Sequence, residues 1–195
     1  MSEPRRCWSS ADPAYLEYHD REWGRPVTDE RGLYERLCLE GFQSGLSWLT
    51  ILRKRPAFRV AFADFDPGAV AGFGAREVQR LLGDAGIVRH RGKIEAAIAN
   101  ARATIALREA GTPLPELVWS HRPADGRVPQ TPADWRSTTP ESAALSKRLR
   151  AAGFRFVGPT TVYATMQACG VVNDHLADCL VRAEVEREIA RSTIA

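Results

Sequence analysis

Helical periodicity, together with residues that start and stop helices, recurs along almost the whole chain and constrains its fold most. The clearest case is residues 91–109, where apolar side chains fall on one stripe of a helix. Similar patterns predict helices over residues 30–40, 75–82, 140–152 and 159–170. Strand signal is confined to residues 154–157. The sequence therefore predicts an all-α protein.

The local structure of three further segments can also be predicted. The apolar face around Trp48 predicts a helix that ends before Pro56, because proline disrupts a helix interior. Residues 112–139 are rich in proline, threonine and serine and predict an irregular connection. Asn173 or Asp174 is expected to cap the last helix, over residues 174–190.

Length and composition predict one soluble helical domain over residues 1–195. Hydrophobic residues make up 44% of the chain and charged residues 26%, which is ordinary for a globular protein. No apolar run reaches the roughly 20 residues that a membrane span needs, and the N-terminus lacks the apolar core of a signal peptide. Four cysteines are too few for a disulfide scaffold. We expect a cytoplasmic protein, reduced and monomeric, with no membrane partner.

The charged residues are unevenly distributed along the chain. The net charge is only +3, yet residues 41–63 and 142–173 contain no acid and several basic side chains. A third basic cluster runs from Arg89 to Lys93. Such separation can produce a basic face that suits a polyanion such as nucleic acid. Basic side chains that merely solvate helix surfaces explain the pattern equally well.

Two cysteines and two histidines form a candidate metal site. His175 and Cys179 are four residues apart, so on a helix they share one face. Cys7 and His19 lie near the other terminus and would complete a closed tetrahedral zinc site. A closed site leaves no position for water, so this zinc would be structural. Buried free cysteines with incidental histidines, or a Cys7–Cys179 disulfide, remain alternatives, and Cys38 and Cys169 are interpreted as core residues.

The turn at residues 86–92 joins two predicted helices and is a candidate DNA contact. A glycine-containing hairpin between helices can present backbone N–H groups to a phosphate. Arg89, Arg91 and Lys93 add positive charge at this point. The Gly-x-Gly sequence usual in a helix-hairpin-helix element is missing, however. An ordinary turn with Gly86 as a helix C-cap is an equal alternative.

Glu40 is a candidate functional acid because aromatic residues surround it in the sequence. It is the last carboxylate before the acid-free stretch at 41–63, and Trp48 follows eight residues later. Tyr15, Tyr18 and Trp23 crowd the N-terminal arm. Planar rings stack on extruded bases, and a carboxylate among them can bind a base edge. The alternative is a solvated glutamate beside core aromatics.

Several motifs, in one order along the chain, carry a resemblance to a known family. They are Tyr18–Gly24, Leu37–Gly41, Gln43–Trp48, Asp84–Ile94, Gly153–Gly158, Met166–Gly170 and Asn173–His175. In these motifs the chain resembles the 3-methyladenine DNA glycosylase I family, from residue 7 to about residue 179. The resemblance implies a helix-hairpin-helix DNA glycosylase fold, with two helical lobes, a base-binding cleft and a structural zinc site joining the termini. The zinc-binding arm would be 7–24 with the C-terminal helix 174–190, and the helix-hairpin-helix element about 75–109.

The resemblance also implies an activity and a set of site residues. The activity is monofunctional hydrolysis of the N-glycosidic bond of 3-methyladenine in double-stranded DNA, which leaves an abasic site in base excision repair. The implied catalytic residue is Glu40, and the residues around the base are Tyr15, Tyr18, Trp23 and Trp48. We expect Gly86, Arg89, Arg91 and Lys93 to contact the DNA backbone. The implied ligands of one structural Zn²⁺ are Cys7, His19, His175 and Cys179.

Two departures from the family and two alternative functions accompany this interpretation. Cys7 and Trp8 are adjacent where the family has an intervening glycine, and Phe42 stands where the family often has a polar residue, which predicts a change in pocket polarity. Related glycosylases carry an aspartate after the hairpin, and none follows Lys93 here. A non-catalytic, zinc-stapled DNA-binding module is one alternative. A zinc hydrolase is another, although four available ligands argue against an open metal position.

Overall fold

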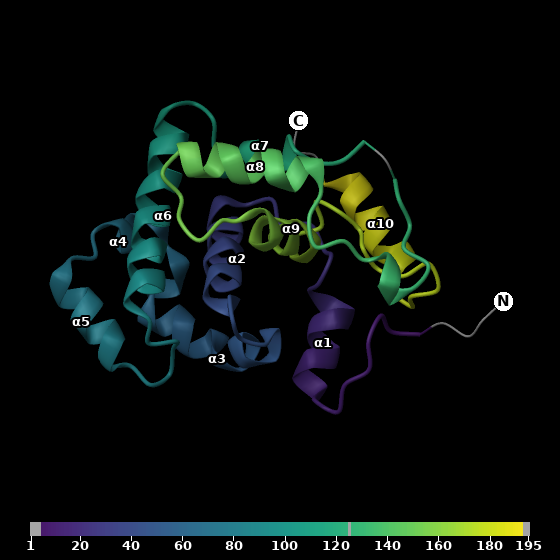
Figure 1. Ribbon diagram of the computed structural model, residues 1–195, viewed down its shortest axis with the longest axis horizontal. Coiled ribbons are helices and arrows are strands. Elements are labelled where there is room, and N and C mark those ends of the chain that lie inside the picture. The colour runs from purple at the N-terminus through teal and green to yellow at the C-terminus, as the bar shows by residue number, and fades with distance from the viewer. Residues whose placement is uncertain (1–4, 125, 193–195) are drawn as a thin grey trace.

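Helices form nearly all of the regular structure (Figure 1). The computed structural model describes residues 5–124 and 126–192. Its α-helices are α1 (Pro13–Arg21), α2 (Glu30–Gln43), α3 (Trp48–Ala61), α4 (Pro67–Ala71), α5 (Ala75–Gly83), α6 (Arg91–Glu109), α7 (Leu114–Trp119), α8 (Pro140–Ala151), α9 (Pro159–Ala168) and α10 (Arg182–Arg191). Two short 3-10 helices are η1 (Ala63–Phe65) and η2 (Pro132–Asp134). No β-strand occurs in the described ranges, so the prediction of an all-α fold is confirmed.

Side-chain caps explain where several of these helices begin. The Asp29 carboxylate accepts the Gly32 N–H at 2.8 Å at the start of α2, and Asp66 accepts the Gly68 N–H at 2.9 Å before α4. The Ser47 hydroxyl accepts the Thr50 N–H and starts α3 after a turn that contains Gly45 at φ +82°. These caps satisfy N–H groups that have no partner inside the helix.

Helix α2 lies at the centre of the molecule and packs on α3, α6, α7 and α9. In Figure 1, α4, α5 and α6 lie to its left and α9 and α10 to its right. Leu33, Tyr34 and Leu37 are at most 1% exposed, and the Tyr34 hydroxyl donates to the Ala97 carbonyl of α6 at 2.9 Å. Buried residues from Cys7 to Ile189 form one continuous hydrophobic cluster. This packing fixes the position of the last turn of α2. The expected division into two lobes with a base-binding cleft stays a prediction.

Two local predictions were wrong because tertiary packing overrides local signals. Helix α3 continues through Pro56 to Ala61. The hydrogen bond lost at the proline is offset by burial of Phe58 and Ala61, which are 0% and 2% exposed. Residues 154–157 form a bend and no strand, because Phe156 has a φ of +55°.

Two further boundaries also differ from the predictions. The connection over residues 112–139 contains α7 and η2, and the first turn of α7 accommodates a proline. The last helix begins at Arg182, well after Asn173 and Asp174. Residues 175–181 are irregular because His175 and Cys179 both turn inward toward the N-terminal arm. The predicted helix over 174–190 was therefore wrong at its start.

Candidate functional site

Glu40 is buried in the last turn of α2, with its side chain 6% exposed. Its carboxyl makes no hydrogen bond or ion pair with any residue that the structure describes. Burial raises the pKa of Glu40 to about 8, against a smaller lowering by the positive charge of Arg36. At neutral pH the carboxyl is therefore mostly protonated. A buried titratable group without a partner is typical of a functional site.

Three of the predicted rings gather beside this acid. The Tyr18 and Trp48 ring centroids are 5.3 Å apart, and Tyr15 stacks on Tyr18 at 6.4 Å. Burial raises the pKa of both tyrosines, and negative charge on Glu40 adds to the rise. The indole N–H of Trp48 is buried and finds no acceptor among the described groups. Together, the free acid, the free donor and the rings suit a flat, polar and cationic ligand.

Trp23 lies in a second ring cluster, against the histidines near the two termini. Its ring centroid is 4.6 Å from that of His175 and 6.2 Å from that of His19. Trp8 connects the two clusters, at 5.3 Å from Tyr15 and 5.0 Å from Trp23. The Trp8 indole N–H is also buried without a partner in the described chain. Sequence analysis missed Trp8 as a site residue, although its place beside a predicted ligand was a signal.

Arg36 is a second residue that sequence analysis missed. Its guanidinium lies 5.7 Å from the centroid of the Tyr18 ring and donates to Glu22 at 2.9 Å. Arg55 binds the same carboxylate, at 2.7 Å. Burial raises the pKa of Glu22, but these two arginines outweigh it and bring the pKa to about 2. The spacing of Arg36 and Glu40, one helical turn apart, was the available signal.

The predicted hairpin joins α5 to α6 over residues 84–90. A Cβ on Gly86 would lie 2.9 Å from the Ala57 Cβ of α3, so the close approach of the two segments requires glycine. The Lys54 ammonium donates to the Ala85 and Gly86 carbonyls at 2.9 and 3.3 Å, which ties the hairpin to α3. Arg89 and Arg91 are exposed at its tip. This arrangement leaves positive charge at the N-terminus of α6.

Lys93 does not lie on the surface with those arginines. Its side chain is buried, and its ammonium donates to the Phe42 and Ser44 carbonyls at 2.9 and 2.6 Å. The ammonium is bound to the C-terminal end of α2, so its position gives no support to the predicted DNA contact, which stays a prediction. Phe42 is 1% exposed and packs on Phe58 at 4.6 Å, so its ring belongs to the core and does not change pocket polarity.

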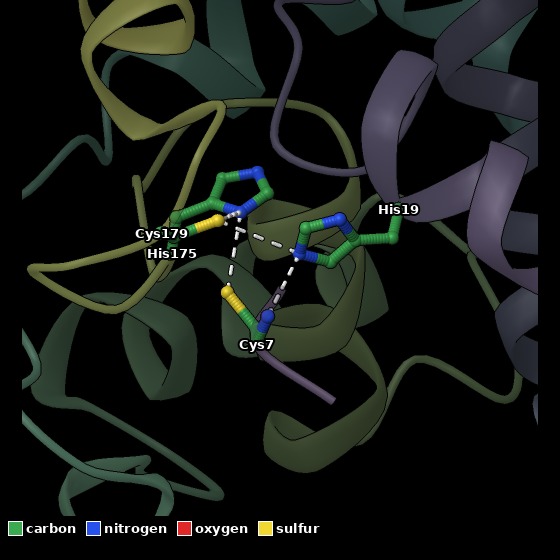
Figure 2. A group of neighbouring side chains, drawn as sticks. All are labelled: Cys7, His19, His175 and Cys179. Atoms are coloured by element: carbon green, nitrogen blue, oxygen red, sulfur yellow. Dashed lines mark hydrogen bonds between the residues drawn. The ribbon is translucent and has the colours of Figure 1, made fainter. Parts of the chain in front are cut away.

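The four predicted metal ligands lie together (Figure 2), all buried and with their ligand atoms within 4.8 Å of one another. The Nδ1 atom of His175 is 3.4 Å from the Cys7 sulfur and 3.3 Å from the Cys179 sulfur. His19 approaches Cys179 through Nε2, at 3.6 Å. His175 and Cys179 come from the irregular segment before α10, so the prediction that they share one face of a helix was wrong. Two cysteines and two histidines so placed form a donor set that suits a metal ion.

Contacts outside the four ligands support that interpretation. The other ring nitrogen of His19 lies 2.8 Å from the Asp20 carboxylate, and that of His175 lies 2.9 Å from the Trp23 carbonyl. Histidines that bind metals usually make such a second hydrogen bond, which fixes the ring and its tautomer. All four cysteines are free, so the Cys7–Cys179 disulfide does not form, and Cys38 and Cys169 are buried in the core.

The Cys/His cluster joins the N-terminal arm to the segment before α10. Arg5 forms a parallel bridge with Cys179, in which the Arg5 N–H donates to the Asp178 carbonyl at 3.1 Å. The Leu180 N–H donates to the Arg5 carbonyl at 3.0 Å. The adjacency of Cys7 and Trp8 therefore does not keep Cys7 out of the cluster.

Among the helices of residues 5–124 and 126–192, none combines the length and the hydrophobicity that a membrane-spanning segment requires.

Stability should fall as the pH rises toward 8, because of Glu40. The folded protein holds this proton up to a pKa of about 8, whereas the ordinary value is 4.5. The folded state therefore binds more protons than the unfolded state between these values, and each rise in pH favours unfolding. We expect ionisation of Glu40 to lower the free energy of unfolding by about 2 kcal/mol between roughly pH 6 and 8. Urea unfolding of wild type and Glu40→Gln at both pH values measures it, and parallel pH profiles for the two proteins would contradict it.

Solved structures of 3-methyladenine DNA glycosylase I have the same fold. A crystal structure of 3-methyladenine DNA glycosylase I matches it with a TM-score of 0.87 and 48% identity, over 90% of this chain and 98% of that one. A tyrosine-to-phenylalanine variant of 3-methyladenine DNA glycosylase I, solved in complex with 3-methyladenine, matches with a TM-score of 0.85 and 36% identity, over 89% and 94%.

Sequence comparison gives the family. The methyladenine glycosylase family model matches residues 8–183. DNA-3-methyladenine glycosylase 1 of Escherichia coli (strain K12) is 50% identical over 177 residues, which cover 89% of this chain and 95% of that protein. The chain belongs to the methyladenine glycosylase family, and the resemblance found in the sequence motifs is confirmed.

Proposed function

We propose that this protein is a monofunctional N-glycosylase that releases 3-methyladenine from alkylated double-stranded DNA and leaves an abasic site. The observation that carries the proposal is the buried, unpaired carboxyl of Glu40 beside the rings of Tyr18 and Trp48. The relatives support the substrate, since one of them is described as bound to 3-methyladenine. Excision of this base is a step of base excision repair.

Glu40 recognises the base, and the neighbouring rings stack on it. Methylation at N3 makes adenine a cation while it is attached to DNA. A cation beside Glu40 favours the ionised carboxylate, so the base enters as the carboxyl loses its proton. Tyr15, Tyr18 and Trp48 form the stacking surface, and Trp23 with Trp8 closes the side toward the metal cluster. The free indole N–H groups of Trp8 and Trp48 are donors for the base.

Bond cleavage then needs little acid catalysis, because the base is already a good leaving group. The damaged nucleotide is first extruded from the duplex. The C–N bond breaks with its electron pair moving to the base, which leaves as neutral 3-methyladenine. The carboxylate of Glu40 stabilises the positive charge that develops on the sugar. Water adds to the sugar and releases a proton to the solvent, which completes the hydrolysis.

The hairpin holds the DNA backbone. Arg89 and Arg91 place positive charge at the start of α6, where a phosphate binds well. The Gly86 N–H donates to the Asp84 carboxylate at 2.7 Å, so Gly86 contributes through the close packing of the hairpin on α3. The ammonium of Lys93 is bound to two carbonyls, which argues against a Schiff base with the sugar. We therefore assign no strand-cleaving activity to this lysine.

The metal cluster completes the proposal. We propose that Cys7, His19, His175 and Cys179 hold one zinc ion, which would supply folding energy and no chemistry, since four protein ligands leave no open position. Reduced cysteines fit a cytoplasmic location. We further propose that the chain acts on DNA as a monomer and as one domain.

The test is release of the free base. Purified protein is incubated with duplex DNA treated with a methylating agent, and the supernatant is analysed by chromatography. We expect 3-methyladenine to be released, abasic sites that break only under alkali, and no adduct trapped by borohydride. Tight binding to the DNA without release of base would instead identify a non-catalytic binding module. A borohydride-trapped adduct would overturn the assignment as monofunctional.

A further inference from the structure

Phe156 has a strained backbone and an exposed ring, and the proposed function gives it no role. Its φ is +55°, in the left-handed region that bulky side chains avoid, and its side chain is 39% exposed. Phe65 shares the positive φ, at +56°, but is fully buried in the core. Core packing therefore explains the strain at Phe65 and leaves the strain at Phe156 unexplained.

Buried side chains hold Phe156 in this conformation from both sides. The Asn100 amide, 2% exposed on α6, donates to the Arg155 carbonyl at 3.2 Å and accepts the Arg155 N–H at 2.7 Å. The Ser146 hydroxyl of α8 donates to the Val157 carbonyl at 2.6 Å. The residues before and after Phe156 are thus fixed by buried polar groups. A strained residue that its surroundings over-determine points to a function.

The ring lies between the last turn of α2 and the hairpin. A Cβ on Gly41, the residue after Glu40, would lie 3.4 Å from the Phe156 Cβ. A Cβ on Gly92 would lie 4.0 Å from its ring edge, and the His90 ring is perpendicular to it at 6.3 Å. Phe156 therefore bridges the segment that carries the proposed catalytic acid and the segment that holds DNA.

The surroundings indicate what Phe156 contacts. Three exposed arginines lie close to this ring in the sequence. Arg155 directly precedes Phe156, and Arg89 and Arg91 flank His90, whose ring contacts that of Phe156. An exposed aromatic ring within a basic rim suits nucleic acid, because bases stack on rings while arginines bind phosphates. Resting on the proposed glycosylase function, we infer that Phe156 stacks on a DNA base that flanks the extruded nucleotide. The contact would hold the duplex open beside Glu40.

The test separates binding of DNA from binding of the free base. Phe156→Gly removes the ring and suits the positive φ, so its melting temperature should not fall because of backbone strain. We expect its affinity for a duplex with a tetrahydrofuran abasic analogue, measured by fluorescence anisotropy, to fall about tenfold. Phe156→Tyr should restore it. Affinity for free 3-methyladenine, measured by tryptophan fluorescence, should be unchanged in both.

Val128→Gly is the matched control, because Val128 is also 39% exposed but lies between α7 and η2, in a pocket lined by Asn173 and Arg182 of the C-terminal segment. Its DNA affinity should equal that of the wild type. A folded Phe156→Gly variant with wild-type DNA affinity would overturn the inference, and so would an equal loss of free-base binding. If the wild type releases no 3-methyladenine, the proposed function is wrong. The inferred contact between Phe156 and DNA would still be supported in that case if DNA affinity falls in Phe156→Gly.

Discussion

Replacing Glu40 by glutamine is expected to lower the single-turnover rate of 3-methyladenine release by about 10²–10³-fold, a typical loss for one electrostatic group. Glutamine keeps the size of the side chain and can still hydrogen-bond, but it cannot ionise. Because Glu40 makes no ion pair or hydrogen bond in the described structure, the substitution breaks no existing bond of either kind. The lost rate would therefore report the charge that the carboxylate places beside the developing cation.

Two controls separate chemistry from folding. Removal of a buried acid whose pKa is raised to about 8 should leave the fold intact and stabilise it at alkaline pH, so lower activity would accompany equal or higher stability. Phe42, two residues further along α2, points into the core, so Phe42→Leu tests whether any change near this turn has the same effect. Undiminished excision by Glu40→Gln would remove the role assigned to this residue.

The sequence located Glu40 because local pattern and chemistry agree there. The acid precedes a long stretch without acids and lies near aromatic residues in the chain, and the structure keeps Tyr15, Tyr18 and Trp48 beside it. Helix starts were also predictable, since the Asp29 and Asp66 caps are local. Helix type and capping depend on residues within a few positions of one another, and one sequence shows these directly.

Features that depend on distant contacts could not be read in the same way. The sequence gives no sign that the Lys93 ammonium is bound to the end of α2, about 50 residues earlier in the chain. The irregular backbone at His175 follows from contacts with Cys7 and Trp23, near the opposite terminus. Trp8 and Arg36 acquire their places from tertiary packing, as does the strained turn at Phe156.

Loss of the metal should have the largest effect on stability. The Cys/His cluster holds the N-terminal arm, which carries Trp8 and Tyr15, against the segment before α10. Structural zinc contributes folding free energy directly. If removal costs about 5 kcal/mol, the melting temperature should fall by roughly 10–20 °C, since 1 kcal/mol corresponds to about 2–4 °C in a protein of this size. Scanning calorimetry with and without a chelator measures the shift.

Cysteine variants test whether the four ligands are the right ones. Cys179→Ser should lose the metal by elemental analysis and melt at the temperature of the chelated wild type. Cys169→Ser is the matched control, because Cys169 is also buried and free but lies outside the cluster, so it should keep one zinc per chain. Since the arm carries Trp8, Tyr15, Tyr18 and Trp23, metal loss should also weaken base release. Two results would contradict the zinc assignment. One is full metal content in Cys179→Ser, and the other is a wild type purified without metal whose melting temperature does not change when zinc is added.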